Sequence, residues 1–119
     1  MNSKKPFSRM ERVNNQVLVI LGDIHLKHIN LLGLGFITIT SVDVAPDLRS
    51  AKVFFSVLNP TMSLDKVTIE MNKKRKAFKK FMGPELSFKS TPDLSFYLDE
   101  TFIYEEKIGR LLKKTNLEK

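Results

Sequence analysis

The sequence contains no cysteine, and glycine and proline are scarce, with five of each among 119 residues. Without cysteine the chain cannot form disulfides, thiolate zinc sites or a cysteine nucleophile. A hydrophobic content of 42% with few chain-breaking residues indicates a globular protein rather than a disordered or fibrous one. This length suits one modest core, so we expect a single domain over residues 1–119.

Long hydrophobic runs are also missing. The longest apolar stretch that is nearly free of charge, residues 17–21, is far shorter than a membrane span. The N-terminal residues lack the hydrophobic core of a secretion signal, because Pro6 and Glu11 follow soon after the first lysines. We therefore expect a cytoplasmic protein without membrane contact, with flexible ends near residues 1–6 and 114–119.

Charge is plentiful but unevenly placed, and its sum is +7. Residues 4–12 carry four cations and one acid, whereas residues 85–106 carry six acids and one lysine. The densest cluster has cations and no acid, and its members are Lys73, Lys74, Arg75, Lys76, Lys79 and Lys80. Positive charge that is clustered rather than scattered predicts a polyanionic partner.

The first half of the chain predicts a helix followed by a β-hairpin. Ser8 and Glu11 have capping-box spacing, and apolar residues then recur every three or four positions, which predicts a helix over residues 9–25. We expect a loop over residues 26–35.

Two strands follow this loop. Alternating β-branched residues predict a strand over residues 36–44, and a run of apolar residues at both parities predicts a central strand over residues 51–58. A proline-containing turn joins them as an antiparallel hairpin. The apolar residues change parity in the first strand, which predicts a bulge near residues 40–41.

After the second strand, apolar residues again recur at helical spacing, but the cation cluster interrupts this pattern. Helical spacing would turn Lys74 or Arg75 toward the core, yet burying an unpaired ammonium costs several kcal/mol. This cost exceeds the gain from burying one large apolar neighbour, which is about 1.5–3 kcal/mol. We therefore predict two helices, over residues 63–75 and 77–83, joined at an exposed cationic elbow.

A third strand is predicted over residues 94–99, and apolar spacing from Phe102 onward predicts a C-terminal helix. The order is then α-β-β-α-α-β with an additional helix at the end. A three-stranded sheet with helices on one face buries these stripes most economically, so we predict the α+β class.

Two segments resemble the bacterial ribosome-binding factor A family. Residues 37–58, "ITITSVDVAPDLRSAKVFFSVL", resemble the hairpin signature of that family, and residues 91–102, "TPDLSFYLDETF", resemble its third strand. The resemblance implies a type II KH-like fold and a non-catalytic factor that binds the 16S rRNA of the small (30S) ribosomal subunit. It further implies a role in subunit maturation, in 5′-end processing of the rRNA and in growth in the cold. Lys74-Arg75-Lys76 stands where the family usually has an Ala-x-Gly kink.

The cation cluster falls where a KH domain presents its nucleic-acid-binding elbow, so these six side chains are the predicted RNA-binding residues. Lysines attract phosphates without reading sequence, and Arg75 can clamp a phosphate or stack on a base. Because the chain has no GxxG sequence there, we expect recognition of the shape of folded rRNA. The predicted footprint also includes Arg49, Lys52, Arg9 and Arg12.

Several alternatives stay open. The cluster can instead be a solvated helix face, and the protein can be a general KH-like adaptor for RNA or protein, unconnected with ribosome assembly. We expect the four aromatic strand residues, Phe54, Phe55, Phe96 and Tyr97, to be core rather than a stacking platform.

No chemistry beyond binding is predicted. His25 and His28 are expected to be structural rather than metal ligands, and Asp99 with Glu100 is expected to start the last helix. No catalytic motif or phosphate-binding loop is present, so we predict no cofactors. We expect a monomer, because the sequence shows no apolar surface beyond the residues assigned to the core. Other assembly factors are possible further partners.

Overall fold

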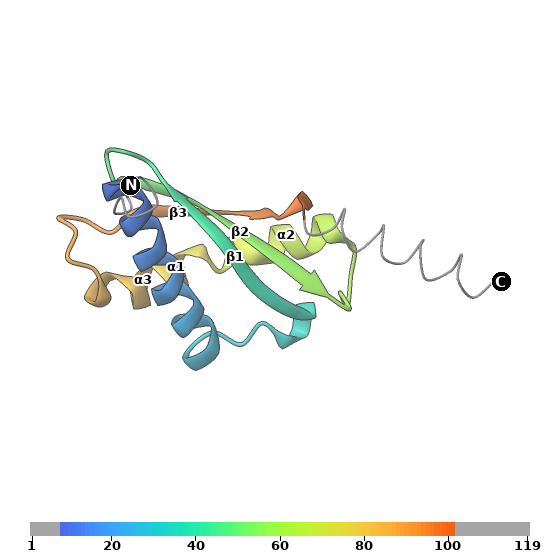
Figure 1. Ribbon diagram of the computed structural model, residues 1–119. Helices are drawn as coiled ribbons and strands as arrows, with labels where there is room; N and C mark the ends of the chain where they lie inside the picture. The colour runs from blue at the N-terminus through green and yellow to red at the C-terminus, as the bar shows by residue number, and fades with distance from the viewer. Residues whose placement is uncertain (1–7, 102–119) are drawn as a thin grey trace.

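The computed structural model describes residues 8–101 (Figure 1). The predicted order of elements is confirmed as far as β3. The C-terminal helix predicted from Phe102 and both predicted flexible ends lie outside the described residues. In order, the elements are α1 (Arg9–Lys27), the 3-10 turn η2 (Leu32–Leu34), β1 (Phe36–Val44), β2 (Ser50–Leu58), α2 (Leu64–Lys73), α3 (Arg75–Met82), the 3-10 turn η3 (Gly83–Glu85) and β3 (Asp93–Leu98).

The first helix begins where its capping sequence predicts. The Ser8 hydroxyl accepts a hydrogen bond from the Glu11 backbone N–H at 3.1 Å. The helix continues to Lys27, two residues beyond the predicted end, and the predicted loop contains η2. Leu31 and Leu34 in this segment are buried, which explains why it folds back onto the core instead of remaining an open loop.

The sheet has the order β1-β2-β3. β1 and β2 are antiparallel, as predicted, and the predicted bulge is confirmed at Thr40, since Ile39 lies opposite Phe55 and Ser41 opposite Phe54. The Thr40 hydroxyl donates to the Asp99 carboxylate at 2.7 Å, so the bulge in β1 is fastened to the residue that follows β3.

β3 runs parallel to β2, because the chain crosses over from one to the other through α2 and α3. α1 packs against β1, α2 and α3 pack against β3, and α1 also contacts α3 (Figure 1). The helices thus cover one face of the sheet, as predicted. In the part of the chain that the structure describes, no helix is both long and apolar enough to cross a membrane.

The expectation that all four aromatic strand residues are core is wrong for two of them. Phe55 and Phe96 are fully buried between sheet and helices, with 0% and 1% exposure. Phe54 is half-buried, and Tyr97 keeps 43% of its surface exposed. Successive strand residues point to opposite faces, so Phe54 and Tyr97 lie on the face that helices α1–α3 leave open.

Candidate nucleic-acid interface

The cationic elbow is the joint between α2 and α3 together with its six cations, Lys73, Lys74, Arg75, Lys76, Lys79 and Lys80. α2 ends at Lys73 and α3 begins at Arg75, so the helix break lies at Lys74, slightly earlier than predicted. The backbone of Lys74 has φ −94° and ψ 1°, which leaves the regular helix at this single residue.

The break resolves the conflict between core packing and charge. Met71 and Phe78, on either side of it, are both 0% exposed. Phe78 packs against Phe96 with ring centroids 5.2 Å apart, which fixes α3 on the sheet. Between these anchors Arg75 and Lys76 are exposed, as predicted from the cost of burying them.

Two grooves flank the elbow, and Arg75 and Lys76 line both of them. The first groove, of about 460 Å³, is completed by Thr68, Ile69, Asn72 and Lys73. The second, of about 540 Å³, lies between α3 and the start of β3 and is completed by Lys79, Asp93, Leu94 and Ser95. The elbow thus presents cations along two adjacent concave surfaces.

Two carboxylates hold the outer cations of the elbow. The Lys73 ammonium lies 2.8 Å from the Glu70 carboxylate, and the Lys79 ammonium lies 2.7 Å from the Asp93 carboxylate. The hydrogen bond from Lys73 lowers the pKa of Glu70, and the hydrogen bond from Lys79 lowers the pKa of Asp93. Sequence reasoning did not identify either acid. The three-residue spacing of Glu70 and Lys73 was a usable signal, whereas Asp93 and Lys79 meet only in the fold.

The lowered pKa of Asp93 predicts a specific pH dependence of stability. Because its pKa is lower in the folded than in the unfolded state, the stabilising contribution is complete above the unfolded value and disappears as pH falls through the folded value. The thermal midpoints of wild type and Asp93→Asn should therefore differ slightly at neutral pH and converge below about pH 4. Circular dichroism melts across this range test the prediction. A gap that widens toward acid pH would contradict it.

Asn72 fastens the end of α2 to β3. Its side-chain amide donates to the Phe96 carbonyl at 2.9 Å and accepts from the Phe96 N–H at 2.9 Å. The same amide also donates to the Thr68 carbonyl within α2. Asn72 directly precedes the cations in the chain, so these bonds fix the position of the elbow relative to β3. No pattern in the sequence pointed to this residue.

Replacing Asn72 by alanine should destabilise the protein by about 2–3 kcal/mol, because two partly buried backbone groups of Phe96 lose their partner. Urea unfolding followed by circular dichroism measures this. Asn15→Ala, at an exposed position of α1, is the control and should change stability by less than about 0.5 kcal/mol. Equal effects of the two substitutions would show that the Asn72 bonds do not contribute.

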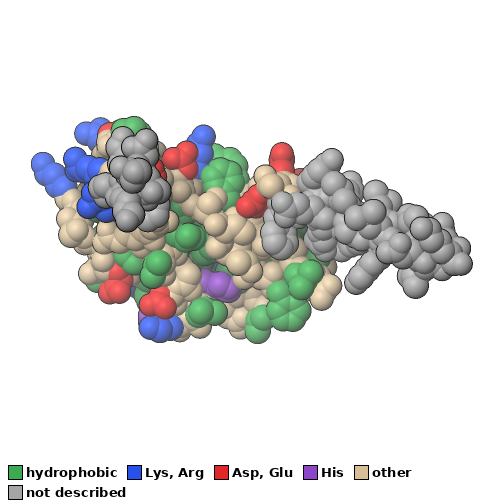
Figure 2. Space-filling view, viewed as in Figure 1, with side chains coloured by type: hydrophobic (Ala, Val, Ile, Leu, Met, Phe, Trp, Pro, Cys, Tyr) green, Lys and Arg blue, Asp and Glu red, His purple; other side chains and the backbone are tan. Residues whose placement is uncertain are grey.

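The other predicted RNA-binding residues lie in two different places. The Arg49 carbonyl accepts from the N–H of Asp93, which lines the second groove, but Arg49 itself is not among the residues that line it. Arg9 and Arg12 start α1 at the same end of the molecule as the β1–β2 turn, and Figure 2 shows several Lys and Arg side chains there. Lys52 does not join the elbow, because it projects from the open face of the sheet.

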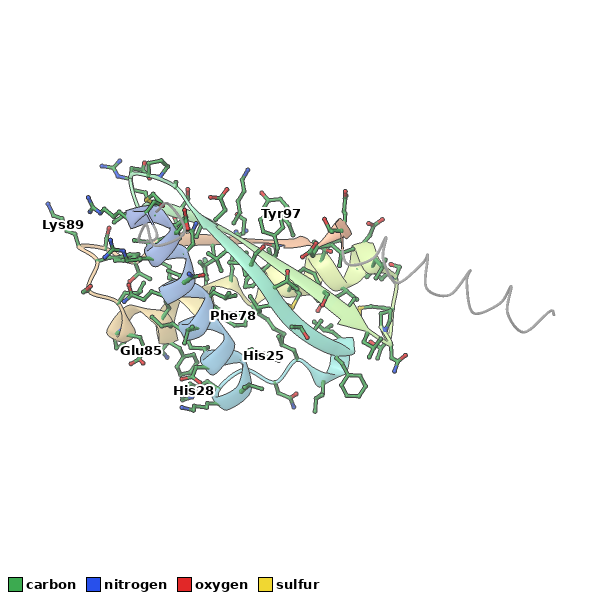
Figure 3. All side chains as sticks on the ribbon, viewed as in Figure 1. His25, His28, Phe78, Glu85, Lys89 and Tyr97 are labelled. Atoms are coloured by element: carbon green, nitrogen blue, oxygen red, sulfur yellow. The ribbon has the colours of Figure 1, made fainter. Side chains whose placement is uncertain are left out.

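The two histidines have structural contacts. The His25 ring nitrogens lie 3.4 Å and 3.1 Å from the carbonyl oxygens of Ile29 and Ile37, linking α1 to β1. His28 stacks on Phe81 with ring centroids 4.4 Å apart, linking α1 to α3 (Figure 3). Residues 8–101 contain no group of three or more His, Cys, Asp or Glu side chains suited to holding a metal ion.

Comparison with known proteins gives a consistent result. The family profile described as ribosome-binding factor A matches residues 9–112 of the chain. Ribosome-binding factor A of Pediococcus pentosaceus is 35% identical over 109 residues, which cover 91% of this chain and 94% of that protein.

Solved structures agree with this match at the level of the fold. The crystal structure of ribosome-binding factor A from Thermus thermophilus matches with a TM-score of 0.65 at 11% identity, covering 76% of this chain and 97% of that one. A homology model of the Thermus thermophilus factor, fitted into a cryo-EM map of its complex with 30S, matches with a TM-score of 0.56 at 12% identity. It covers 71% of this chain and 88% of that one. These likenesses confirm the predicted α+β, KH-like fold.

Proposed function

The chain belongs to the ribosome-binding factor A family, and we propose that it binds the 16S rRNA of the small (30S) ribosomal subunit and assists its maturation. One observation carries the proposal. The helix break at Lys74 turns a group of cations outward while Met71 and Phe78 on either side stay buried. The relative that was fitted into a map of a 30S complex supports the same partner.

The central contacts come from Lys74, Arg75 and Lys76, which form no ion pair with any residue from 8 to 101. Their ammonium and guanidinium groups bind rRNA phosphates, and Arg75 can make a bidentate contact. α3 begins without a side-chain cap, so the backbone N–H groups of its first turn are additional phosphate donors. This mode positions the protein on folded RNA without reading base sequence.

The outer cations add to this surface in a graded way. To bind a phosphate, Lys73 must break its ion pair with Glu70, and Lys79 must break its ion pair with Asp93. Each of these two lysines therefore contributes less net affinity. Lys80 extends the elbow along α3. Arg49, Arg9 and Arg12 continue the positive surface toward the turn between β1 and β2.

The wider role that we propose is the one that membership of this family implies. The protein acts as a single-domain monomer in the cytoplasm, without catalysing a reaction, and its presence promotes 5′-end processing of 16S rRNA, above all in the cold. Other assembly factors meet it on the same subunit. A strain that lacks the protein should accumulate 16S rRNA with an unprocessed 5′ end, and more of it at low temperature. Normal processing at every temperature would contradict this role.

Co-sedimentation with small subunits across a salt series tests the binding proposal. We expect log affinity to fall linearly with log salt, by about 0.7–0.9 per phosphate contact. Mature subunits and precursors should both be used, because the proposed role concerns maturation of the subunit. Failure to bind either at low salt would overturn the proposal and leave the general adaptor.

A further inference from the structure

The open face of the sheet carries a pair of aromatic residues that are not part of the buried core. Phe54 and Tyr97 lie next to each other in the register of β2 and β3, with ring centroids 5.8 Å apart and planes tilted by 32°. Tyr97 points away from the helix-covered side on which Phe78 lies (Figure 3). With 43% of its surface exposed, the Tyr97 ring is accessible to a ligand.

The neighbours of the pair on this face are small and polar, or charged. Ser41 extends the row of Phe54 and Tyr97 across β1, and the flanking rows hold Asp43, Lys52 and Ser95 on one side and Thr38 and Ser56 on the other. The exposed apolar residues Phe36 and Leu58 lie one row further along. The two rings are not surrounded by further apolar side chains, as they would be in a contact site for an apolar protein surface. A flat ring with polar edges fits this setting better.

Lys52 supplies the charge that such a ligand needs. It lies two residues before Phe54 on the same face of β2, which places the two about 7 Å apart along the strand. Asp43 is opposite Lys52 in the register, yet the ammonium forms no ion pair within residues 8–101. Tyr97 lies beside Phe54 in the same row, so an exposed ring and a separate ammonium stand in neighbouring rows of the sheet, which suits the base and the phosphate of one nucleotide.

We propose that the open sheet face is a second RNA site, which binds an unpaired nucleotide with its base stacked on Tyr97 and its phosphate near Lys52. This inference rests on the proposed function, in which the partner is RNA. Aromatic side chains on exposed sheet surfaces stack unpaired bases, and every base offers a ring face. Ser41 and Ser95 provide hydroxyls for the sugar and base edges. The site lies on the sheet face opposite the elbow helices, and Ser95, which also lines the second groove, lies between the two RNA-binding surfaces at the edge formed by β3.

Stacking and ion pairing respond differently to salt, and the test uses this difference. Binding of fluorescently labelled single-stranded oligoadenylate is measured by anisotropy over a salt series. Tyr97→Leu should weaken binding about five- to tenfold and leave the salt slope unchanged, because no ionic contact is lost. Tyr97→Phe should bind like wild type. Lys52→Gln should reduce the slope by about 0.7.

Leu26→Ala is the matched control, because it removes an exposed apolar side chain from α1, where 80% of the Leu26 surface is accessible. It should change neither affinity nor slope. Unchanged binding by Tyr97→Leu, in a protein whose elbow variants lose binding, would overturn the second site and leave the proposed function standing. If Tyr97→Leu lost binding to small subunits but kept binding to oligoadenylate, this face would instead contact a ribosomal protein. Absence of all RNA binding would overturn both proposals.

Ultraviolet crosslinking of the wild-type protein gives an independent readout that needs no substitution. Mass spectrometry of the oligoadenylate adduct should place a crosslink in the peptide that contains Tyr97. Crosslinks confined to peptides of the elbow would overturn the second site.

Discussion

Replacing Lys74, Arg75 and Lys76 together by glutamate should weaken binding to small subunits by at least about 100-fold near physiological salt, because three phosphate contacts become repulsive. The salt slope should fall by about two to three units, one for each contact removed. These residues are the expected centre of the interface, since both grooves share Arg75 and Lys76 and none of the three is paired with an acid in residues 8–101. Co-sedimentation with purified subunits measures both quantities.

The matched control reverses Lys27, Lys66 and Lys89, which are exposed and lie outside the elbow. It changes net charge by the same amount, so any loss caused by total charge alone would appear in both variants. We expect the control to lose less than about tenfold in affinity, through long-range attraction only. If the two triple variants bind equally weakly, the elbow is not the specific contact surface. If the elbow variant binds like wild type, the elbow has no role in binding.

Replacing Phe78 by alanine should have the largest effect on stability. The ring is 0% exposed and packs against Phe96, so its removal leaves a cavity between α3 and β3. Truncations of this kind cost about 3–5 kcal/mol, a large fraction of the stability of a small domain. The thermal midpoint should fall by about 15 °C or more. Differential scanning calorimetry measures the shift.

Phe36→Ala is the control for this prediction, because Phe36 is 59% exposed at the start of β1. It should lower the midpoint by only a few degrees. Phe78→Leu retains most of the apolar volume and should fall between the two. A midpoint for Phe78→Ala close to that of the control would mean that α3 is not held on the sheet by this ring. The elbow would then lack the rigid support on which its shape depends.

The sequence predicted those features that depend on a single dominant energetic contribution. The bulge at Thr40 was predictable because the apolar residues change parity there, and only a bulge keeps Ile39 and Val42 on one face. The break at Lys74 was predictable because a continuous helix would bury a lysine at a cost larger than the gain from its neighbours.

Features that depend on tertiary neighbours were not predictable in the same way. Phe54 and Phe55 have almost the same propensities, and which of them faces the core is decided by the side of the sheet on which the helices pack. The pairing of Lys79 with Asp93 joins residues that are distant in the chain and meet only after β3 has docked beside β2. For these contacts the sequence supplies the chemical groups but not the distances.

Asn72 also affects how separate molecules of this protein meet. β3 is an outermost strand of the sheet, and the outward N–H and C=O of Phe96 are the groups that a strand from another molecule would need for pairing. Asn72 occupies both of them in the middle of β3, so an incoming strand must first break two hydrogen bonds. Unprotected outer strands are common starting points for aggregation. The side chain that anchors the elbow therefore also hinders β3 from pairing with a strand of another molecule.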